Sequence, residues 1–360
     1  YSCINSILVS NNLTKVKVNA LFNALLSIPA KLSWSQNYFD NKKELEIVKH
    51  IDDFSKFNLS PSREKKLRIA FLYANAGLDE LMFNNYAQSE FYFKKAVSIY
   101  DQNIDTASMQ ELYDYVECLG KYATLLWDQE RNDEALAVYD KVIKYTKVIY
   151  ENDKSLISKI NLLSEYICYC NIANSAKQYD IQKKYLEYVS TEIKDCEASN
   201  LKQRTEPFLQ LCWFYYYRDA NDIEKSILSI KQAIDMYSQC ARNDVGMYLP
   251  DLVKSYNFLL QYVYEHSDAI PSDVQNYIEK GDIDIDYIHK EKDYNDEETY
   301  LKFHLLCSLI YLRQNNLPLY LKYRNIAFTY FETLSEEKRN NEKLIEMIKY
   351  YNCEEEKSYE

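Results

Sequence analysis

Glycine and proline are scarce in this sequence. The 360 residues include only 4 glycines and 6 prolines, so the two together make up about 3% where roughly 12% is usual. Sandwiches and barrels need frequent glycine and proline turns, so these classes are excluded. Phosphate-binding loops need clustered glycines, whereas Gly77, Gly120, Gly246 and Gly281 stand far apart. Because 47% of the residues are apolar, disorder is excluded too, and we expect an all-α protein.

Several functional signatures are missing as well. The net charge of −12 argues against nucleic-acid binding, which needs a basic stripe, and no apolar run is long enough to span a membrane. The four histidines lack zinc-binding spacing and no two cysteines form a C-x-x-C pair, so we expect neither a metal nor a cofactor. The nine cysteines fall mostly in apolar helical runs, which indicates reduced core thiols and a cytoplasmic protein. The chain lacks the order of a signal peptide and an initiating Met, and we expect it to be part of a longer protein.

A repeat is present instead. An apolar helix and a short polar turn precede a second helix that carries a small residue, then an aromatic or aliphatic residue four positions later. The clearest copy runs from Glu117 to Ile143, with Ala135 and Tyr139 at those two positions. In two other copies the small position is Ser89 and Ser226, and in the last copy Leu319 occupies it. We predict that the second helices begin at Phe39, Tyr86, Asn132, Tyr179, Ile223, Ile270 and Leu317, in steps of 44 to 47 residues.

Five prolines support this scheme. Pro61, Pro207, Pro250, Pro271 and Pro318 each fall where a helix is expected to start, and the first turn of a helix tolerates proline because its N–H groups have no partner there. One hairpin cannot bury its own apolar face, so neighbouring hairpins must stack. The spacing therefore predicts an α-solenoid.

The repeat resembles tetratricopeptide repeats, in the longer-unit variety of kinesin light chains and of bacterial arrays attached to STAND-type NTPases or CHAT domains. Leu119, Ala123 and Leu126 correspond to the first helix of that family, Asn84 to Tyr86 to its turn, and YLPDLVKSYNFLL (248–260) to a repeat opening. The resemblance implies a right-handed α-solenoid of about six to seven antiparallel hairpins. We expect a helical hairpin or cap over 1–60, the solenoid over 61–334, and a capping helix with an acidic tail over 335–360.

In such solenoids the first helix of each pair lines the concave surface, which binds a protein or peptide. Carrying that register over predicts a row of groove-facing side chains, which starts near Thr124 and ends near Tyr311. Amides, hydroxyls, aromatic rings and one guanidinium in this row could hold an extended backbone and apolar side chains. The predicted partner-binding residues are Trp127, Asn171, Asn174, Tyr215, Arg218, Asn257, Gln261, Tyr264, His304 and Tyr311.

Three functional hypotheses follow. The first is a non-catalytic protein-recognition solenoid, the sensor or scaffold region of a larger protein that carries or assembles with a catalytic domain, and by extension a STAND- or CHAT-type protein of bacterial antiviral defence. The second is a peptide-binding regulator similar to the quorum-sensing tetratricopeptide receptors, although residues 1–60 show no basic recognition helix. An enzyme is the third reading, and no motif in the sequence supports it.

Overall fold

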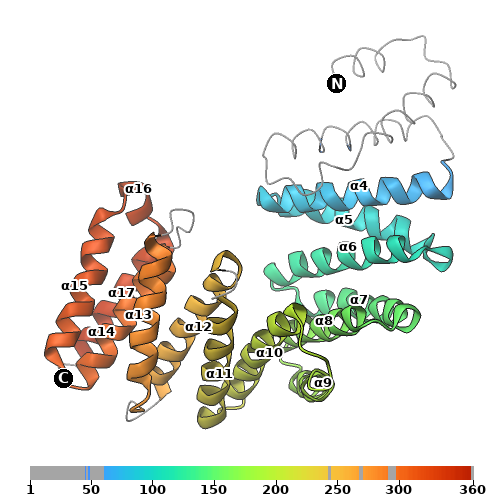
Figure 1. Cartoon of the computed structure of the whole chain (residues 1–360). Coiled ribbons are helices and arrows are strands. Elements are labelled where there is room, and N and C mark those ends of the chain that lie inside the picture. The colour runs from blue at the N-terminus through green and yellow to red at the C-terminus, as the bar shows by residue number, and fades with distance from the viewer. Residues whose placement is uncertain are drawn as a thin grey trace, which may run out of the picture. The chain divides into compact units, whose positions relative to one another are not determined.

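The computed structural model describes Leu45, Val48 and residues 61–241, 245–266, 271–290 and 297–357, with side chains left out at 245–247 and 288–290. Every regular element in these ranges is a helix, which confirms the all-α class. The chain divides after Gln178 into two compact units. The N-terminal unit contains α4 (Arg63–Met82), α5 (Tyr86–Asp101), η2 (Ile104–Thr106), α6 (Met109–Asp128), α7 (Asn132–Asp153) and α8 (Leu156–Ser175) (Figure 1).

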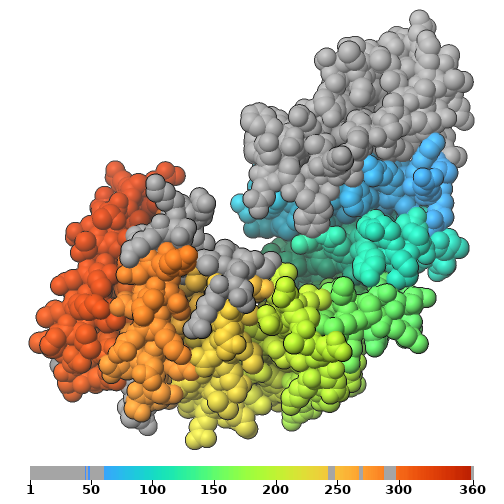
Figure 2. All heavy atoms as spheres, viewed as in Figure 1, coloured from blue at the N-terminus to red at the C-terminus, as the bar shows by residue number. Residues whose placement is uncertain are grey.

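The C-terminal unit is built in the same way. Its helices are α9 (Tyr179–Glu192), α10 (Asn200–Asp219), α11 (Ile223–Ala241), α12 (Val245–His266), α13 (Val274–Lys290), α14 (Glu297–Arg313), α15 (Leu317–Thr333), α16 (Glu336–Arg339) and α17 (Glu342–Lys357). Within each unit, consecutive helices pack against one another, and first helices also contact the next first helix, as α4 contacts α6 and α12 contacts α14. Figure 2 shows the result, in which successive segments of a unit cover neighbouring bands of its surface.

Five of the seven predicted helix starts are confirmed. Second helices begin at Tyr86, Asn132, Tyr179, Ile223 and Leu317, as the repeat predicts. Phe39 and Ile270 lie outside the described residues, and α13 begins at Val274. Of residues 1–60, the predicted N-terminal hairpin or cap, the structure describes only Leu45 and Val48, both buried. The region predicted to cap the C-terminal end forms α16 and α17 up to Lys357, and α17 packs against α14.

One turn geometry recurs between the paired helices. The second residue after the first helices α4, α6, α8, α10 and α14 adopts a left-handed conformation, with φ between 56° and 60°, at Asn84, Glu130, Lys177, Asn221 and Asn315. The N–H of the following residue donates to the carbonyl five residues earlier, at 2.8–2.9 Å, as Arg131 does to Leu126. This is the Schellman turn, which glycine favours because it lacks a Cβ. Here Asn, Glu and Lys occupy the position, which explains how the chain turns with so few glycines.

The small positions allow close helix contact. Ser89, Ala135 and Ser226, at the small position of the repeat, are all buried. Ser89 Oγ donates to the Gly77 carbonyl oxygen at 2.6 Å, so α5 crosses α4 at that glycine. A Cβ added to Gly77 would lie only 3.0 Å from the Phe93 ring.

The proline prediction is wrong at two positions. Pro318 starts α15, Pro61 precedes the N-cap Ser62 of α4, and Pro271 precedes α13, as expected. Pro207 and Pro250, however, lie inside α10 and α12. Proline in a helix deprives the carbonyl four residues earlier of its partner. In α10 the Cys240 thiol of α11 donates to that carbonyl, on Gln203, at 3.2 Å, so a tertiary contact replaces the lost backbone bond.

Candidate functional site: a pocket between α12, α14 and α17

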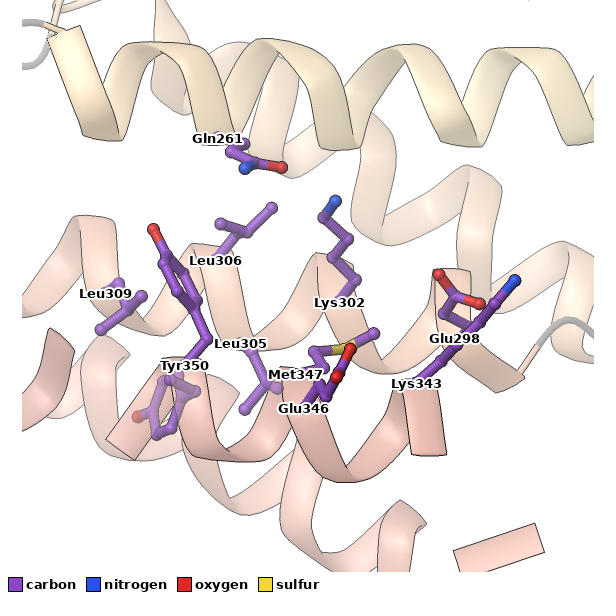
Figure 3. Close-up of a pocket in the computed structure, with 11 residues that line it drawn as sticks. Gln261, Glu298, Lys302, Leu305, Leu306, Leu309, Lys343, Glu346, Met347 and Tyr350 are labelled. Atoms are coloured by element: carbon purple, nitrogen blue, oxygen red, sulfur yellow. The ribbon is translucent and has the colours of Figure 1, made fainter. Parts of the chain in front are cut away.

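A pocket of about 330 Å³ opens between three helices of the C-terminal unit. Two of them, α12 and α14, are first helices of neighbouring pairs, and α17 lies on the other side of α14 (Figure 3). The pocket is therefore on the face that first helices share. Its lining consists of Gln261, Glu298, Lys302, Leu305, Leu306, Leu309, Lys343, Glu346, Met347, Tyr350 and Tyr351.

The pocket combines an apolar floor with a polar rim. Leu305, Leu306 and Leu309 stand on one side of α14 and are nearly fully buried, while the half-buried Met347 faces them from α17. Two lysines and two glutamates lie among the lining side chains (Figure 3). Such a lining suits a ligand that is apolar at one point and polar around it.

Lys302 is the most unusual group in the pocket. It is half-buried, and in Figure 3 its ammonium group extends away from α14 toward α12. Burial lowers the pKa of this lysine, and the neighbouring Glu298 and Glu265 carboxylates partly oppose the effect. A charge that is partly removed from water gains more from a ligand's hydrogen-bond acceptor than an exposed one does.

One end of the pocket is closed by a bridge from α12 to α17. The Glu265 carboxylate accepts hydrogen bonds from Gln261 Nε2 at 2.8 Å and from the Tyr350 hydroxyl at 3.3 Å. Burial raises the pKa of Tyr350, so this phenol stays protonated and donates. A second bond, from the Tyr264 hydroxyl to Glu354 at 3.2 Å, fastens α17 to α12 as well.

The same face continues toward α10. Phe258 lies one turn before Gln261 on α12 and packs edge-on against Tyr215 of α10, with ring centroids 5.8 Å apart. The Arg218 guanidinium lies 5.2 Å from the centre of the Tyr215 ring. Asp251 of α12 is exposed on its outer atoms, and partial desolvation by the surrounding protein raises its pKa. Aromatic and charged groups therefore extend the pocket along α12.

The predicted groove residues fall into two groups in this unit. Gln261 lines the pocket, and Tyr215 and Arg218 lie on its extension along α12. The prediction is wrong for four others, which are buried and cannot contact a partner in this arrangement: Asn257, Tyr264, His304 and Tyr311.

Each buried residue is covered by a neighbouring helix. His304 is fully buried, with Nδ1 4.0 Å from Asp282 of α13 and its ring stacked on Tyr323 of α15 at 5.9 Å. Tyr311 stacks on Tyr323 too, at 5.5 Å. Tyr264 lies under α17, and Asn257 Nδ2 donates to the Thr299 carbonyl at 3.1 Å.

The N-terminal unit holds the remaining predicted residues. Trp127 is half-buried near the end of α6, and its indole Nε1 donates to Ser175 Oγ of α8 at 2.9 Å. Asn171 and Asn174 are half-buried on α8. Thr124 is exposed on α6, with its hydroxyl bonded to the Gly120 carbonyl at 3.0 Å. These residues stay predictions as partner contacts.

Sequence reasoning missed the leucine floor and the α17 wall. On α14 a buried residue occurs at nearly every position from Leu301 to Tyr311, so periodicity alone could not separate the groove face from the core. Met347 and Tyr350 belong to a helix that follows the last predicted repeat. Only the amphipathic pattern of α17 signalled that one of its faces packs against the solenoid.

The described residues contain no group of His, Cys, Asp and Glu side chains that could hold a metal ion. In the same ranges, no helix is long and apolar enough to cross a membrane. Six of the eight cysteines in the described ranges are buried, as predicted, and burial raises the pKa of the half-buried Cys168 thiol to about 12. Such thiols are packing residues with little thiolate character.

No protein-family model and no curated protein matches the sequence. Among solved structures, the apo form of RapI is similar to this chain with a TM-score of 0.53 and 11% identity, over 90% of this chain and 93% of RapI. Aspartyl phosphate phosphatase F from Bacillus subtilis also gives 0.53, with 16% identity over 96% of this chain and 85% of that one. A tetratricopeptide repeat protein from Parabacteroides merdae gives 0.48, with 12% identity over 92% and 98%. The first two likenesses show a shared helical repeat fold.

Proposed function

We propose that this chain is a non-catalytic recognition protein that binds a peptide on the shared face of α12, α14 and α17. The observation that carries the proposal is the pocket itself, with leucines and Met347 at the floor and charged groups at the rim. A volume of about 330 Å³ takes one or two side chains, at the lower end of ligand pockets. This size favours the second hypothesis drawn from the sequence, a peptide-binding regulator, over a scaffold with a broad, flat interface.

The chemistry of the face fits an extended peptide. One apolar side chain in the leucine pocket would contribute roughly 1.5–3 kcal/mol by leaving water. The Gln261 amide and the Lys302 ammonium are positioned to meet backbone carbonyls beside that side chain. The aromatic extension through Phe258 and Tyr215 offers a place for residues further along the peptide. The 11–16% identity to the two solved structures supports transfer of their fold, and not of the phosphatase activity in one name.

Selection from a random ten-residue peptide library, displayed on mRNA and panned against the full chain, tests the proposal. Enriched peptides are then measured by fluorescence anisotropy against three variants. Met347→Glu places a charge at the floor, Lys302→Met removes the half-buried ammonium, and Lys349→Glu reverses an exposed charge of α17 that does not line the pocket.

We expect enriched peptides to share one apolar position, Met347→Glu to weaken binding at least tenfold, and Lys302→Met to weaken it severalfold. Lys349→Glu should change little. Failure to enrich any peptide against a folded chain, or equal binding to Met347→Glu and Lys349→Glu, would contradict the proposal.

A further inference from the structure

A second hollow lies between α9 and α11, on the side of α10 that faces away from the proposed peptide site. It measures about 370 Å³. On α10 its lining residues Glu206, Gln210, Trp213 and Tyr217 recur every three or four positions and form one stripe. Tyr215, on the proposed peptide face, stands two positions from Trp213 and so points to the opposite side of the helix. The two hollows are therefore separate surfaces of the C-terminal unit.

The cleft follows from the short α9. This helix has 14 residues, against 19 in α11, and ends at Glu192, so α10 stays uncovered beyond that point. In the segment that connects α9 to α10, the side chains of Ile193 and Cys196 are buried. Lys202 Nζ donates a hydrogen bond to the Cys196 carbonyl at 2.9 Å. A fixed segment thus forms one wall.

The floor of the cleft is aromatic and rigid. Trp213 and Tyr217 stack with centroids 5.1 Å apart and planes inclined by only 18°. The indole Nε1 donates to Ser190 Oγ at 2.9 Å, which holds the ring in place. Leu209 and Ile193 are almost fully buried below, whereas Leu228 at the edge leaves 56% of its surface exposed. Tryptophan and tyrosine in well-packed pockets are enriched among protein-binding hot spots.

Among the side chains that line this cleft, lysines outnumber acids by one, although the chain carries −12 overall. Two lysines, Lys194 and Lys225, line the cleft against one acid, Glu206. Lys225 lies 2.7 Å from Asp222 and 5.3 Å from the centre of the Tyr217 ring. Glu206 is itself 3.7 Å from Lys202. Lys194 forms no hydrogen bond or ion pair with any residue in the described ranges, so its charge is available to a partner.

We propose that this cleft docks an acidic segment of a partner protein, which inserts a bulky apolar side chain against Trp213 and Tyr217 while its carboxylates meet Lys194 and Lys225. The apolar contact supplies affinity, and the opposite charges select the partner and speed the encounter. The volume of about 370 Å³ takes one or two side chains, which matches one anchor residue and a neighbour. The inference is independent of the proposed peptide site.

The test uses three fluorescein-labelled, amidated peptides on the full chain: SEDLFDELGS, its basic counterpart SKKLFKKLGS, and SEDSSDESGS, which lacks the apolar residues. Binding is measured by anisotropy, and the site by ¹³C-methyl NMR, because Met236 lines the cleft and Met347 lines the other pocket. The variants are Lys194→Glu, Leu228→Ser and the control Lys184→Glu, an exposed lysine of α9 that does not line the cleft. All three positions are exposed, so folding is expected to survive, and circular dichroism checks it.

We expect only the first peptide to bind, with the Met236 methyl signal shifting and the Met347 signal unchanged. Lys194→Glu should weaken binding about tenfold, Leu228→Ser severalfold, and Lys184→Glu less than twofold, and added salt should weaken the wild-type complex. Equal binding of the acidic and basic peptides, no detectable binding at millimolar peptide, or a shift confined to Met347 would overturn the inference.

Discussion

Replacing Gly77 by alanine should separate packing from helix propensity. Gly77 and Gly120 both lie inside helices of the N-terminal unit, α4 and α6. A Cβ at Gly120 would meet nothing within 4 Å, whereas a Cβ at Gly77 would lie 3.0 Å from two ring atoms of Phe93. The same substitution therefore adds one methyl group in open space or against a packed ring.

We expect the two substitutions to change the free energy of unfolding differently. Alanine is about 1 kcal/mol better than glycine inside a helix, so Gly120→Ala should raise the free energy of unfolding by about that amount. Gly77→Ala gains the same propensity, but overpacking costs roughly 1–3 kcal/mol. Phe93 is fully buried and stacked on Tyr122 at 5.9 Å, so it has little room to move. We therefore expect Gly77→Ala to be less stable than Gly120→Ala by roughly 1–3 kcal/mol.

Urea unfolding followed by far-ultraviolet circular dichroism measures both variants beside the wild type, with equal denaturant slopes as the control that the unfolded states are alike. The difference between the two variants isolates the packing contribution. Equal stabilisation by both substitutions would refute the close crossing of α4 and α5 at Gly77.

Three further predictions concern the turns, the core and a charge pair. Glu130→Gly should stabilise the chain by roughly 0.5–1 kcal/mol, because glycine relieves the left-handed backbone at φ 60°; a lower midpoint in urea would contradict this. Ala135→Arg should destabilise by several kcal/mol through overpacking and a buried charge, since Ala135 is fully buried; an unchanged melting curve would show that the repeat register is wrong there. The Arg131 guanidinium, 2.8 Å from Glu90, lowers the pKa of that carboxyl from 4.5 to about 2. Its contribution to stability is therefore present above pH 4.5 and is lost as pH falls toward 2, so Arg131→Gln should make unfolding less pH-dependent in this range, as urea curves at pH 5, 3.5 and 2.5 would test.

The helix starts could be predicted from the sequence because they depend on local features that recur. The same turn, with its left-handed residue and its backbone bond, ends the first helix before Tyr86, Asn132 and Ile223. Each copy of the repeat therefore predicted the start of its second helix independently of the other copies. Pro207 could not be placed in this way, since the bond that makes it tolerable comes from Cys240 on another helix.

The binding face was harder to predict because α14 is apolar on almost every side. Buried residues occupy nearly every position around Cys307, so the sequence does not distinguish the face of α14 that lines the groove from the face that packs in the core. His304 and Tyr311 were therefore predicted on the groove face, although both are buried. Gln261 does line the pocket, on a helix that keeps exposed polar residues such as Lys254 and Glu265; its role as a partner contact stays a prediction. The contribution of Met347 depends on how a helix outside the repeat packs, which no local pattern specifies.

Methionine-methyl NMR of the full chain with a library-selected peptide tests the central claim most directly. Met347 lines the pocket between α12, α14 and α17, Met236 lines the cleft beside α9, and Met82 is exposed at the end of α4. A peptide bound where we propose should shift the Met347 signal and leave those of Met236 and Met82 in place. Saturating binding that moves Met82 or Met236 while Met347 stays unchanged would contradict the account.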